Sequence, residues 1–314
     1  MRNTFLVSFL VSASLSVVAA PSTFAAPVVG GTVVPAHAWP DAVAVLAPRA
    51  ACTGTLIAPD VVLTAGHCIG VHPVEVIVDT IDYGSSGGER IAVASAHAYP
   101  SWDTTYDVGV LVLASPAKAK PRAIAATCTL DTALYDGAAV RLVGFGLTTA
   151  SGTGDNSRLH QAVVPVTDAA CSDPLACQPR VAPDGEFMAG GGGKDSCFGD
   201  SGGPVYVEAA RTGSAALAGV VSRGMGEPGA PCGGGGVYVR ADKVVPWIEK
   251  TTGRTITRTT CAGKGDEVAA GDAGAPDAGG CDASGAGAVG GLGGGLLALA
   301  MALRRGRLPR RRRA

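Results

Sequence analysis

Three short segments of this chain contain the residue types that nucleophilic catalysis needs. Ser201 lies in segment 199–204, of sequence GDSGGP, where glycines let the backbone turn sharply and leave the serine and nearby N–H groups exposed. A serine hydroxyl is a weak nucleophile at neutral pH, so it needs a base to take its proton. His67, in the sequence LTAGHC of segment 63–68, can be that base, and Asp107 can orient it.

Asp107 opens the apolar segment 107–113, of sequence DVGVLVL, so we expect its carboxylate to be partly buried. A buried carboxylate needs a hydrogen-bond donor or a cation, and a ring N–H of His67 would supply one. Simpler interpretations exist, because a serine in a glycine-rich turn is often only a turn residue and an aspartate can merely begin a strand. The remaining histidines lie outside any motif and are expected to be solvated or packed: His37, His72, His97 and His160.

In the order His67, Asp107, Ser201, these segments resemble the chymotrypsin/trypsin family of serine endopeptidases, and the resemblance covers roughly residues 28–253. It implies that Ser201 is the nucleophile and that His67 acts as general base, then as general acid toward the leaving amine. The N–H groups of Gly199 and Ser201 would form the oxyanion hole. The implied activity is hydrolysis of peptide bonds through an acyl-enzyme intermediate, with no cofactor.

The same resemblance implies a substrate preference. Asp195, six residues before Ser201, matches the floor of the family's primary specificity pocket, and three residues match its walls: Ser222, Gly224 and Gly236. A carboxylate at the bottom of a deep slot selects arginine or lysine, because an unpaired buried charge is costly. The implied partners are therefore protein or peptide substrates with Arg or Lys before the cut bond. The simpler interpretation of Asp195 is an exposed loop residue.

Activation by proteolysis is a further implication. Segment 28–31, of sequence VVGG, resembles the family's mature N-terminus, so the new α-amino group of Val28 would pair with Asp200 and organise the site in a zymogen-like step. Activity would then fall at alkaline pH as this amine loses its proton. The residue before Val28 is Pro27, so we do not expect self-activation by a cut after Arg or Lys.

The chain also departs from the family's pattern at Arg223. This arginine stands where the family has a tryptophan, and it could favour acidic residues in the substrate.

The elements that must position these residues are short strands. Apolar runs recur about every 8–12 residues between Gly, Pro and Asp, which indicates a β-sandwich or β-barrel. The resemblance selects two six-stranded antiparallel β-barrels of the trypsin-like type in one all-β domain with a C-terminal helix, expected at about residues 243–252. The expected strands are 42–46, 54–57, 61–64, 74–78, 91–94, 108–113, 140–145, 205–207, 217–222 and 236–240.

Nine cysteines suggest a secreted, disulfide-bonded chain, and spacing alone leaves their pairing open. The resemblance implies Cys52–Cys68 beside the histidine and Cys197–Cys232 beside the pocket. Within that frame, Cys171–Cys177 is our expectation for a local loop, and Cys128–Cys261 is the pair that remains. Cys281 is left unpaired. A metal site is not expected, because no metal-binding spacing of Cys and His is present.

The two ends of the chain predict targeting. Residues 1–25 resemble a secretory signal peptide, and residues 26–27 would remain as a short propeptide. After the protease domain, 28–253, we expect a flexible Gly/Ala/Asp-rich linker, 254–281. Residues 282–314 contain a weak transmembrane span followed by an arginine cluster, and with Cys281 they resemble myxobacterial-type C-terminal sorting tags. That resemblance implies sorting machinery as a partner and a secreted or surface-anchored protein.

Composition narrows the alternatives. A net charge of −1 argues against nucleic-acid binding, which would need a strongly basic surface. Two other functions were weighed against a protease. An inactive binding module of the same fold is disfavoured by the complete set of His67, Asp107 and Ser201. An esterase is disfavoured because no G-x-S-x-G elbow between a strand and a helix is expected here.

Overall fold

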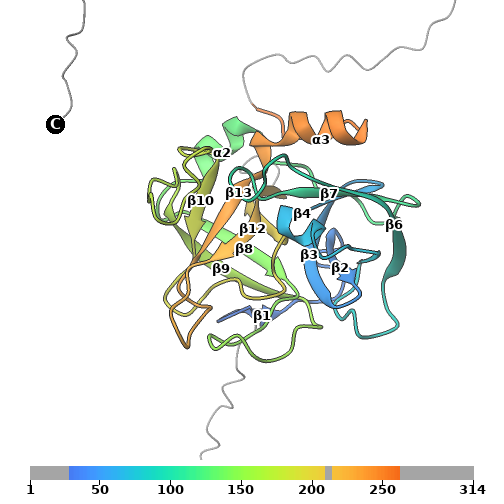
Figure 1. Cartoon of the computed structure of the whole chain (residues 1–314), viewed down its shortest axis with the longest axis horizontal. Helices are drawn as coiled ribbons and strands as arrows, with labels where there is room; N and C mark the ends of the chain where they lie inside the picture. The colour runs from blue at the N-terminus through green and yellow to red at the C-terminus, as the bar shows by residue number, and fades with distance from the viewer. Residues whose placement is uncertain (1–27, 209–213, 262–314) are drawn as a thin grey trace, which may run out of the picture. The chain divides into compact units, whose positions relative to one another are not determined.

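The structure, a computed structural model, describes residues 28–208 and 214–261, and its main feature is a pair of antiparallel β-barrels. The first is a closed barrel of six strands in the order β2-β3-β4-β7-β6-β5. Its strands are β2 Ala42–Ala47, β3 Ala50–Ala58, β4 Val61–Thr64, β5 Glu75–Val78, β6 Glu89–Ala98 and β7 Gly109–Leu113. In Figure 1 it occupies the right-hand side, in blue to cyan.

The second barrel follows in the sequence and lies beside the first (Figure 1). Six strands in the order β9-β10-β13-β12-β11-β8 are closed by pairing of β8 with β9, and the short strand β1 adds to the outside of β9. The strands are β1 Thr32–Val33, β8 Ala139–Gly144, β9 His160–Asp168, β10 Glu186–Ala189, β11 Pro204–Glu208, β12 Ala215–Gly224 and β13 Gly236–Arg240. The expected fold class is confirmed.

Strands β9 and β10 were not predicted, for two physical reasons. Pro165 interrupts the apolar alternation of β9, and a proline inside a run usually indicates that no central strand is present. In the barrel Pro165 still pairs with Ala139 of β8, and its carbonyl accepts the N–H of Gly190. Strand β10 is only four residues long and begins with the charged Glu186, so its sequence carries little strand signal.

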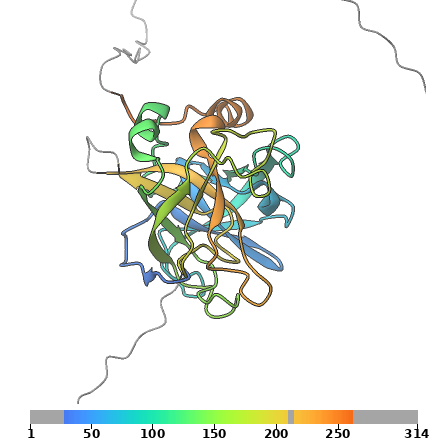
Figure 2. The same ribbon diagram turned by 90° about the vertical axis from the view of Figure 1, so that its left-hand side faces the viewer.

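Helices are few and peripheral: α1 Gly66–Ile69, α2 Thr127–Ala133, a 3₁₀ turn at Ala241–Lys243, and α3 Val245–Thr252. Helix α3 matches the expected C-terminal helix, with Pro246 in its first turn and Gly253 in the left-handed conformation at its end. Helix α2 was not predicted, because it is rich in threonine and has no side-chain cap. Figures 1 and 2 both place α2 and α3 on the same side of the domain.

The chain continues to pack against the domain beyond Gly253. Ile256 is buried in the core, and Cys261 is bonded to Cys128 of α2. Arg254 forms an ion pair with Asp60 of the first barrel. Residues 254–261, expected as the start of a linker, therefore belong structurally to the protease domain.

Most of the targeting predictions fall outside the described residues. These are the signal peptide, the propeptide, the rest of the linker and the C-terminal tag with Cys281. Within 28–208 and 214–261, no helix has both the length and the apolar character needed to span a membrane.

Candidate active site

The histidine and aspartate expected from the sequence are bonded to each other by two contacts. The His67 ring Nδ1 lies 2.8 Å from Oδ2 of Asp107, and the His67 backbone N–H donates to Oδ1 over 2.9 Å. Because a carboxylate only accepts, Nδ1 carries the proton and Nε2 is left as the basic nitrogen. The Asp107 residue is only 7 % exposed, so the ring is held by a desolvated acid.

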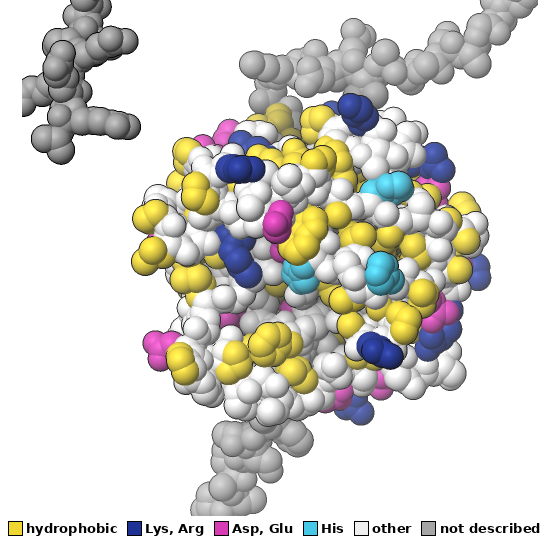
Figure 3. Space-filling model, viewed as in Figure 1, with side chains coloured by type: hydrophobic (Ala, Val, Ile, Leu, Met, Phe, Trp, Pro, Cys, Tyr) yellow, Lys and Arg dark blue, Asp and Glu magenta, His cyan; other side chains and the backbone are white. Residues whose placement is uncertain are grey.

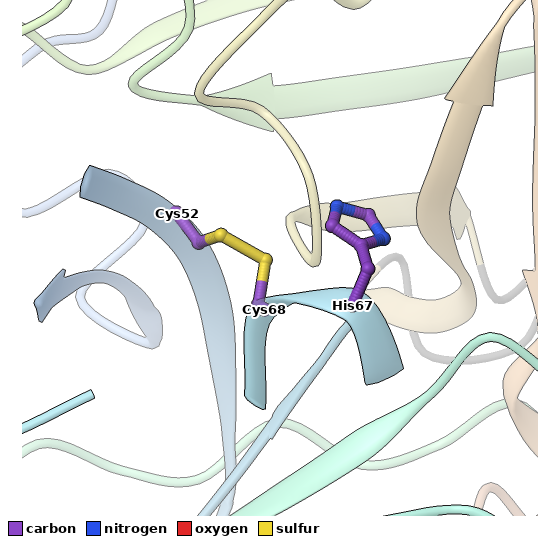
Figure 4. Close-up of side chains that lie close together, drawn as sticks. All are labelled: Cys52, His67 and Cys68. Atoms are coloured by element: carbon purple, nitrogen blue, oxygen red, sulfur yellow. A yellow bond between two sulfur atoms is a disulfide. The ribbon is translucent and has the colours of Figure 1, made fainter. Parts of the chain in front are cut away.

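A disulfide fixes the helix that carries His67. Cys68 follows it on α1, and its sulfur is bonded to that of Cys52 on β3 (Figure 4). The three side chains lie close enough to suggest a metal site. Both sulfurs, however, are consumed by the disulfide, so no thiolate is present to bind a cation.

Ser201 lies in the tight turn between β10 and β11, and two glycines make that turn possible. Gly199 and Gly202 have φ of +101° and +81°, a region that side chains disfavour. A Cβ on Gly202 would also lie 2.4 Å from the carbonyl oxygen of Thr53. The Ser201 carbonyl accepts the Thr53 N–H from the first barrel over 2.9 Å, which holds the turn against β3.

The N–H groups of the turn are available to bind an oxyanion. Among the described residues, neither Gly199 nor Ser201 donates its backbone N–H to an acceptor within the protein. The Gly199 carbonyl is instead fixed by the Thr53 hydroxyl, at 2.8 Å. The peptide unit that contains the Gly199 N–H is held by its own carbonyl, that of Phe198, which accepts the Leu147 N–H at 2.8 Å. That plane is therefore held in place while its donor stays unused, which is the arrangement that oxyanion stabilisation requires.

One cavity brings the candidate residues together. It has a volume of about 630 Å³ and is lined by His67 of the first barrel and by residues of the second, including Ser201, Ser222 and Gly224. The face shown in Figure 3 is hollowed near its centre, with a histidine side chain at the edge of the hollow. Charged side chains are scattered on this face, so no broad single-sign surface surrounds the hollow.

Comparison with known proteins agrees with this geometry. The family model described as Trypsin matches residues 28–248. The chain belongs to the trypsin family. It is 32% identical to the anionic trypsin of Bos taurus over 243 residues, which cover 74% of this chain and 93% of that protein. It is 33% identical to the trypsin of Saccharopolyspora erythraea over 226 residues, which cover 68% and 92% of the two chains. This trypsin-family chain is a serine endopeptidase, a hydrolase.

Asp195 of this trypsin-family domain is fully buried beside the cavity. Oδ1 accepts the Ser196 N–H at 2.7 Å, and Oδ2 accepts the N–H groups of Gly233 and Gly235 at 3.1 and 3.0 Å. Burial raises the pKa of Asp195 above its ordinary value, and these N–H groups oppose that effect in part. Ser196 lines the cavity, whereas Asp195 and the expected wall residue Gly236 lie behind its lining.

Asp200 is a second buried acid, and its carboxylate has only neutral hydrogen-bond donors around it in the described part of the chain. Its carboxylate accepts the N–H groups of Gly146 and Cys197 at 2.7 and 2.8 Å. Burial, together with the nearby charge of Asp195, raises the pKa of Asp200 to about 7, against the opposing effect of these two N–H groups. No ion pair reaches Asp200 from the described residues. Val28, the expected source of an amine, is fully buried in the core of the second barrel.

The disulfides in the structure pair the cysteines as the sequence analysis expected. They join Cys52 to Cys68, Cys128 to Cys261, Cys171 to Cys177 and Cys197 to Cys232. The last of these connects the segment before Ser201 to the loop whose N–H groups bind Asp195. The two segments that bind the Asp195 carboxylate are therefore covalently joined.

Three residues take roles that sequence analysis did not predict. Ser222, expected in the pocket wall, also donates its hydroxyl to Oδ2 of Asp107 at 2.8 Å. Arg223 was expected to favour acidic substrate residues. Instead it forms a bidentate ion pair with the buried Glu186, at 2.7 and 2.8 Å, so its charge is already balanced within the protein. Only part of this was visible in the sequence: Glu186 is an acid next to apolar residues and needs a partner if buried, but no local pattern identifies Arg223 as that partner.

Proposed function

We propose that this chain is a secreted, trypsin-like serine endopeptidase that cleaves peptide bonds after arginine or lysine. One observation carries the proposal: the buried Asp195 carboxylate lies next to Ser196, which lines the cavity that His67 and Ser201 share. The candidate reacting groups thus share one hollow of the surface, and the acid lies directly next to a residue that lines it.

The mechanism follows from the positions of the donors and acceptors. His67 Nε2 takes the Ser201 proton as Oγ bonds to the substrate carbonyl carbon, and the carbonyl oxygen becomes an oxyanion. The free N–H groups of Gly199 and Ser201 bind that oxyanion. The C–N bond then breaks, His67 gives its proton to the leaving amine, and an acyl-enzyme remains. A water molecule then takes the place of the amine. His67 Nε2 accepts a proton from it as the water oxygen bonds to the acyl carbon, the ester bond breaks, and His67 returns the proton to Ser201 Oγ.

Asp107 acts on this cycle through His67. It keeps the proton on Nδ1, so that Nε2 faces the reaction as a base, and it stabilises the imidazolium formed after proton transfer. Its near-complete burial strengthens the interaction, because the charges attract each other in a low dielectric.

Selectivity for basic side chains is proposed to come from Asp195. In the free protein its charge is met only by neutral donors, among them the N–H groups of Gly233 and Gly235. A guanidinium or ammonium group would supply the missing countercharge, whereas an apolar side chain would leave the acid buried and unpaired. Gly224 lines the cavity and has no side chain that would obstruct a long substrate side chain.

Activation is proposed to occur by release of the Val28 amine. Asp200 is a buried acid with a pKa raised to about 7, so a cation next to it would stabilise its charged form. Removal of residues up to Pro27, by a protease other than this one, would create that cation. The turn that carries Ser201 contains Asp200, so the pair would order the oxyanion hole and the pocket together.

Export and sorting complete the proposal. A signal peptide at 1–25 would send the chain out of the cell, in keeping with its four disulfides. The C-terminal segment 282–314 is proposed to engage sorting machinery at the cell surface.

The test uses protein with an authentic Val28 terminus, assayed on matched Arg-, Lys-, Phe- and Ala-amide substrates. We expect turnover of the Arg and Lys amides only, and Ser201→Ala should lower kcat by about 10⁵–10⁶-fold. Asp195→Ser should remove the preference for Arg and Lys while leaving the His67–Asp107 pair intact. No turnover by folded wild-type protein would contradict the protease, and wild-type turnover of the Phe amide would contradict the role of Asp195 alone.

A further inference from the structure

Arg223 connects the catalytic acid to a buried carboxylate on another strand. Its Nη1 donates to Oε1 of Glu186 at 2.7 Å and to Oγ of Ser222 at 3.1 Å. Ser222 in turn donates to Oδ2 of Asp107 at 2.8 Å, and the same oxygen accepts the proton on His67 Nδ1. A continuous hydrogen-bonded chain therefore runs Glu186–Arg223–Ser222–Asp107–His67.

The chemistry of the partners fixes the direction of every bond in this chain. A guanidinium can only donate and a carboxylate can only accept, whereas a hydroxyl has one proton to give. With Arg223 donating to its oxygen, Ser222 must direct its single proton to Asp107. We propose that Arg223 is a positioning residue that orients the Ser222 hydroxyl toward Asp107 and so fixes the acceptor of the His67 ring. This inference deepens the function proposed above and rests on it.

Glu186 holds the guanidinium in the geometry that this role needs. It is fully buried, and its Oε2 accepts both Arg223 Nη2 at 2.8 Å and the Gln178 N–H at 2.7 Å. The carbonyl of Ala176 accepts the remaining N–H groups of Arg223, from Nη2 at 2.6 Å and from Nε at 3.1 Å. With all three nitrogens bound, the side chain has one orientation, and its Nη1 can reach Ser222.

The position of Arg223 supports a role at the site over a purely structural one. It lines the same cavity as His67 and Ser201, and its side chain keeps 30% of its surface exposed. One of its N–H groups donates to Ser222, the residue that is itself bonded to Asp107. A lysine could not replace Arg223, because a single ammonium cannot form the planar fork that binds Glu186 and Ser222 together.

The test is a cycle of variants that remove the link at different points. Arg223→Met/Glu186→Met removes the cation and its acid together, since a buried pair replaced by apolar groups of similar size often keeps its stability. Ser222→Ala breaks the chain between Arg223 and Asp107. The triple variant combines them. Activity is measured as kcat and KM on a benzoyl-arginine anilide, which fills only the primary pocket.

We expect the Met/Met variant to lower kcat by about three- to tenfold with KM unchanged within a factor of two. In the Ser222→Ala background the same two substitutions should have no further effect, because their route to Asp107 is already broken. Arg223→Lys should match the Met/Met variant in kcat although it keeps the charge. The proposal would be overturned if the effects of the Met/Met and Ser222→Ala substitutions on kcat were additive in the triple variant. It would also be overturned if the Met/Met variant changed only the KM for longer peptide substrates.

A spectroscopic measurement keeps this test separate from the proposed function. The low-field proton resonance of His67 Nδ1–H should shift in the Met/Met variant, and should be the same in Ser222→Ala and the triple variant. If the folded wild-type protein proved inactive, the proposed protease function would be contradicted, but this measurement would still be valid. A resonance unmoved in the Met/Met variant would overturn the role of Arg223, whatever the activity.

A matched control removes another buried pair. Arg122 and Asp41 form an ion pair with Asp41 fully buried, and the Tyr206 hydroxyl donates to Asp41 at 2.6 Å. Arg122→Met/Asp41→Leu/Tyr206→Phe removes the pair without leaving a hydroxyl unpaired. It should change stability, and it should leave both kcat and the His67 resonance as in the wild type.

Discussion

Three aspartates in this domain differ because the donors around them differ. Asp107 accepts from His67 and Ser222, Asp195 accepts mainly from backbone N–H groups, and Asp200 is buried with only two N–H donors. The pKa values of Asp195 and Asp200 are both raised by burial. Among the described residues, neither has a cation beside it. These two acids therefore gain most when a positive charge arrives, whether from a substrate or from a new N-terminus.

His160 allows a prediction about stability in acid. It is buried, its Nδ1 has no partner among the described residues, and burial lowers its pKa to about 4. The unfolded chain, with an ordinary pKa near 6.5, binds the proton more tightly, so stability falls as pH drops from about 6.5 to 4. The loss is about 3 kcal/mol. Urea unfolding of His160→Leu should show a flatter pH dependence over this range, and parallel curves would contradict the prediction.

At the scale of elements, strand β3 of the first barrel holds the catalytic turn of the second. The Thr53 hydroxyl donates to the Gly199 carbonyl at 2.8 Å and accepts the Phe145 N–H at 3.1 Å, while its backbone N–H donates to Ser201. One residue of the first barrel thus holds the turn that carries Ser201 through two of its carbonyls, those of Gly199 and Ser201. The geometry of this turn therefore depends on both barrels.

Substituting Thr53 tests this dependence. Thr53→Val should destabilise the domain by about 2–4 kcal/mol, because it leaves a buried N–H and a carbonyl unpaired. It should also lower kcat about tenfold, since the Gly199 carbonyl is freed and the turn between the two proposed oxyanion donors is held less firmly. Thr55→Val on the same strand is the control, because the buried hydroxyl of Thr55 has no partner in the described structure. Denaturant unfolding and steady-state kinetics measure both, and equal effects at the two positions would refute the argument.

The sequence was sufficient for some elements and residues and insufficient for others. His67, Asp107 and Ser201 stand in short segments that identify them, and the apolar runs locate most strands. Strand β9 and helix α2 were missed because Pro165 and a threonine-rich sequence carry the wrong local signal, which tertiary pairing overrides. The pairing of Arg223 with Glu186 joins residues 37 apart, and no local pattern encodes such a distance.

At the scale of the whole molecule, the charge of Asp200 connects processing to stability. In the chain that retains residues before Val28, the folded-state pKa of Asp200 is about 7, against an ordinary value of 3.8. The folded state then binds the proton more tightly, so the stabilisation is fully present below about pH 4 and is lost as pH rises through 7. The difference amounts to about 4 kcal/mol.

Asp200→Asn in the unprocessed chain should remove this pH dependence, which thermal unfolding at pH 4, 6 and 8 can measure. In the chain that begins at Val28, the same substitution should abolish activity, because the amine loses its partner. An unchanged pH slope in the unprocessed variant would contradict the assignment. The His160→Leu variant serves as the reference, since His160 acts in the opposite direction over an overlapping pH range.

The disulfide between Cys128 and Cys261 joins residues 133 positions apart and encloses most of the second barrel in a covalent ring. Arg158 and Arg180 are exposed within that ring. A protease with the arginine preference proposed above would meet copies of itself, and these two side chains are the kind it would attack. A single cut at either position opens the backbone but releases nothing, since both new ends stay joined through the two sulfurs. Cuts at both positions would release residues 159–180, because Cys171 and Cys177 are bonded only to each other. The ring therefore keeps the molecule a single covalent unit after the first cut and not after the second.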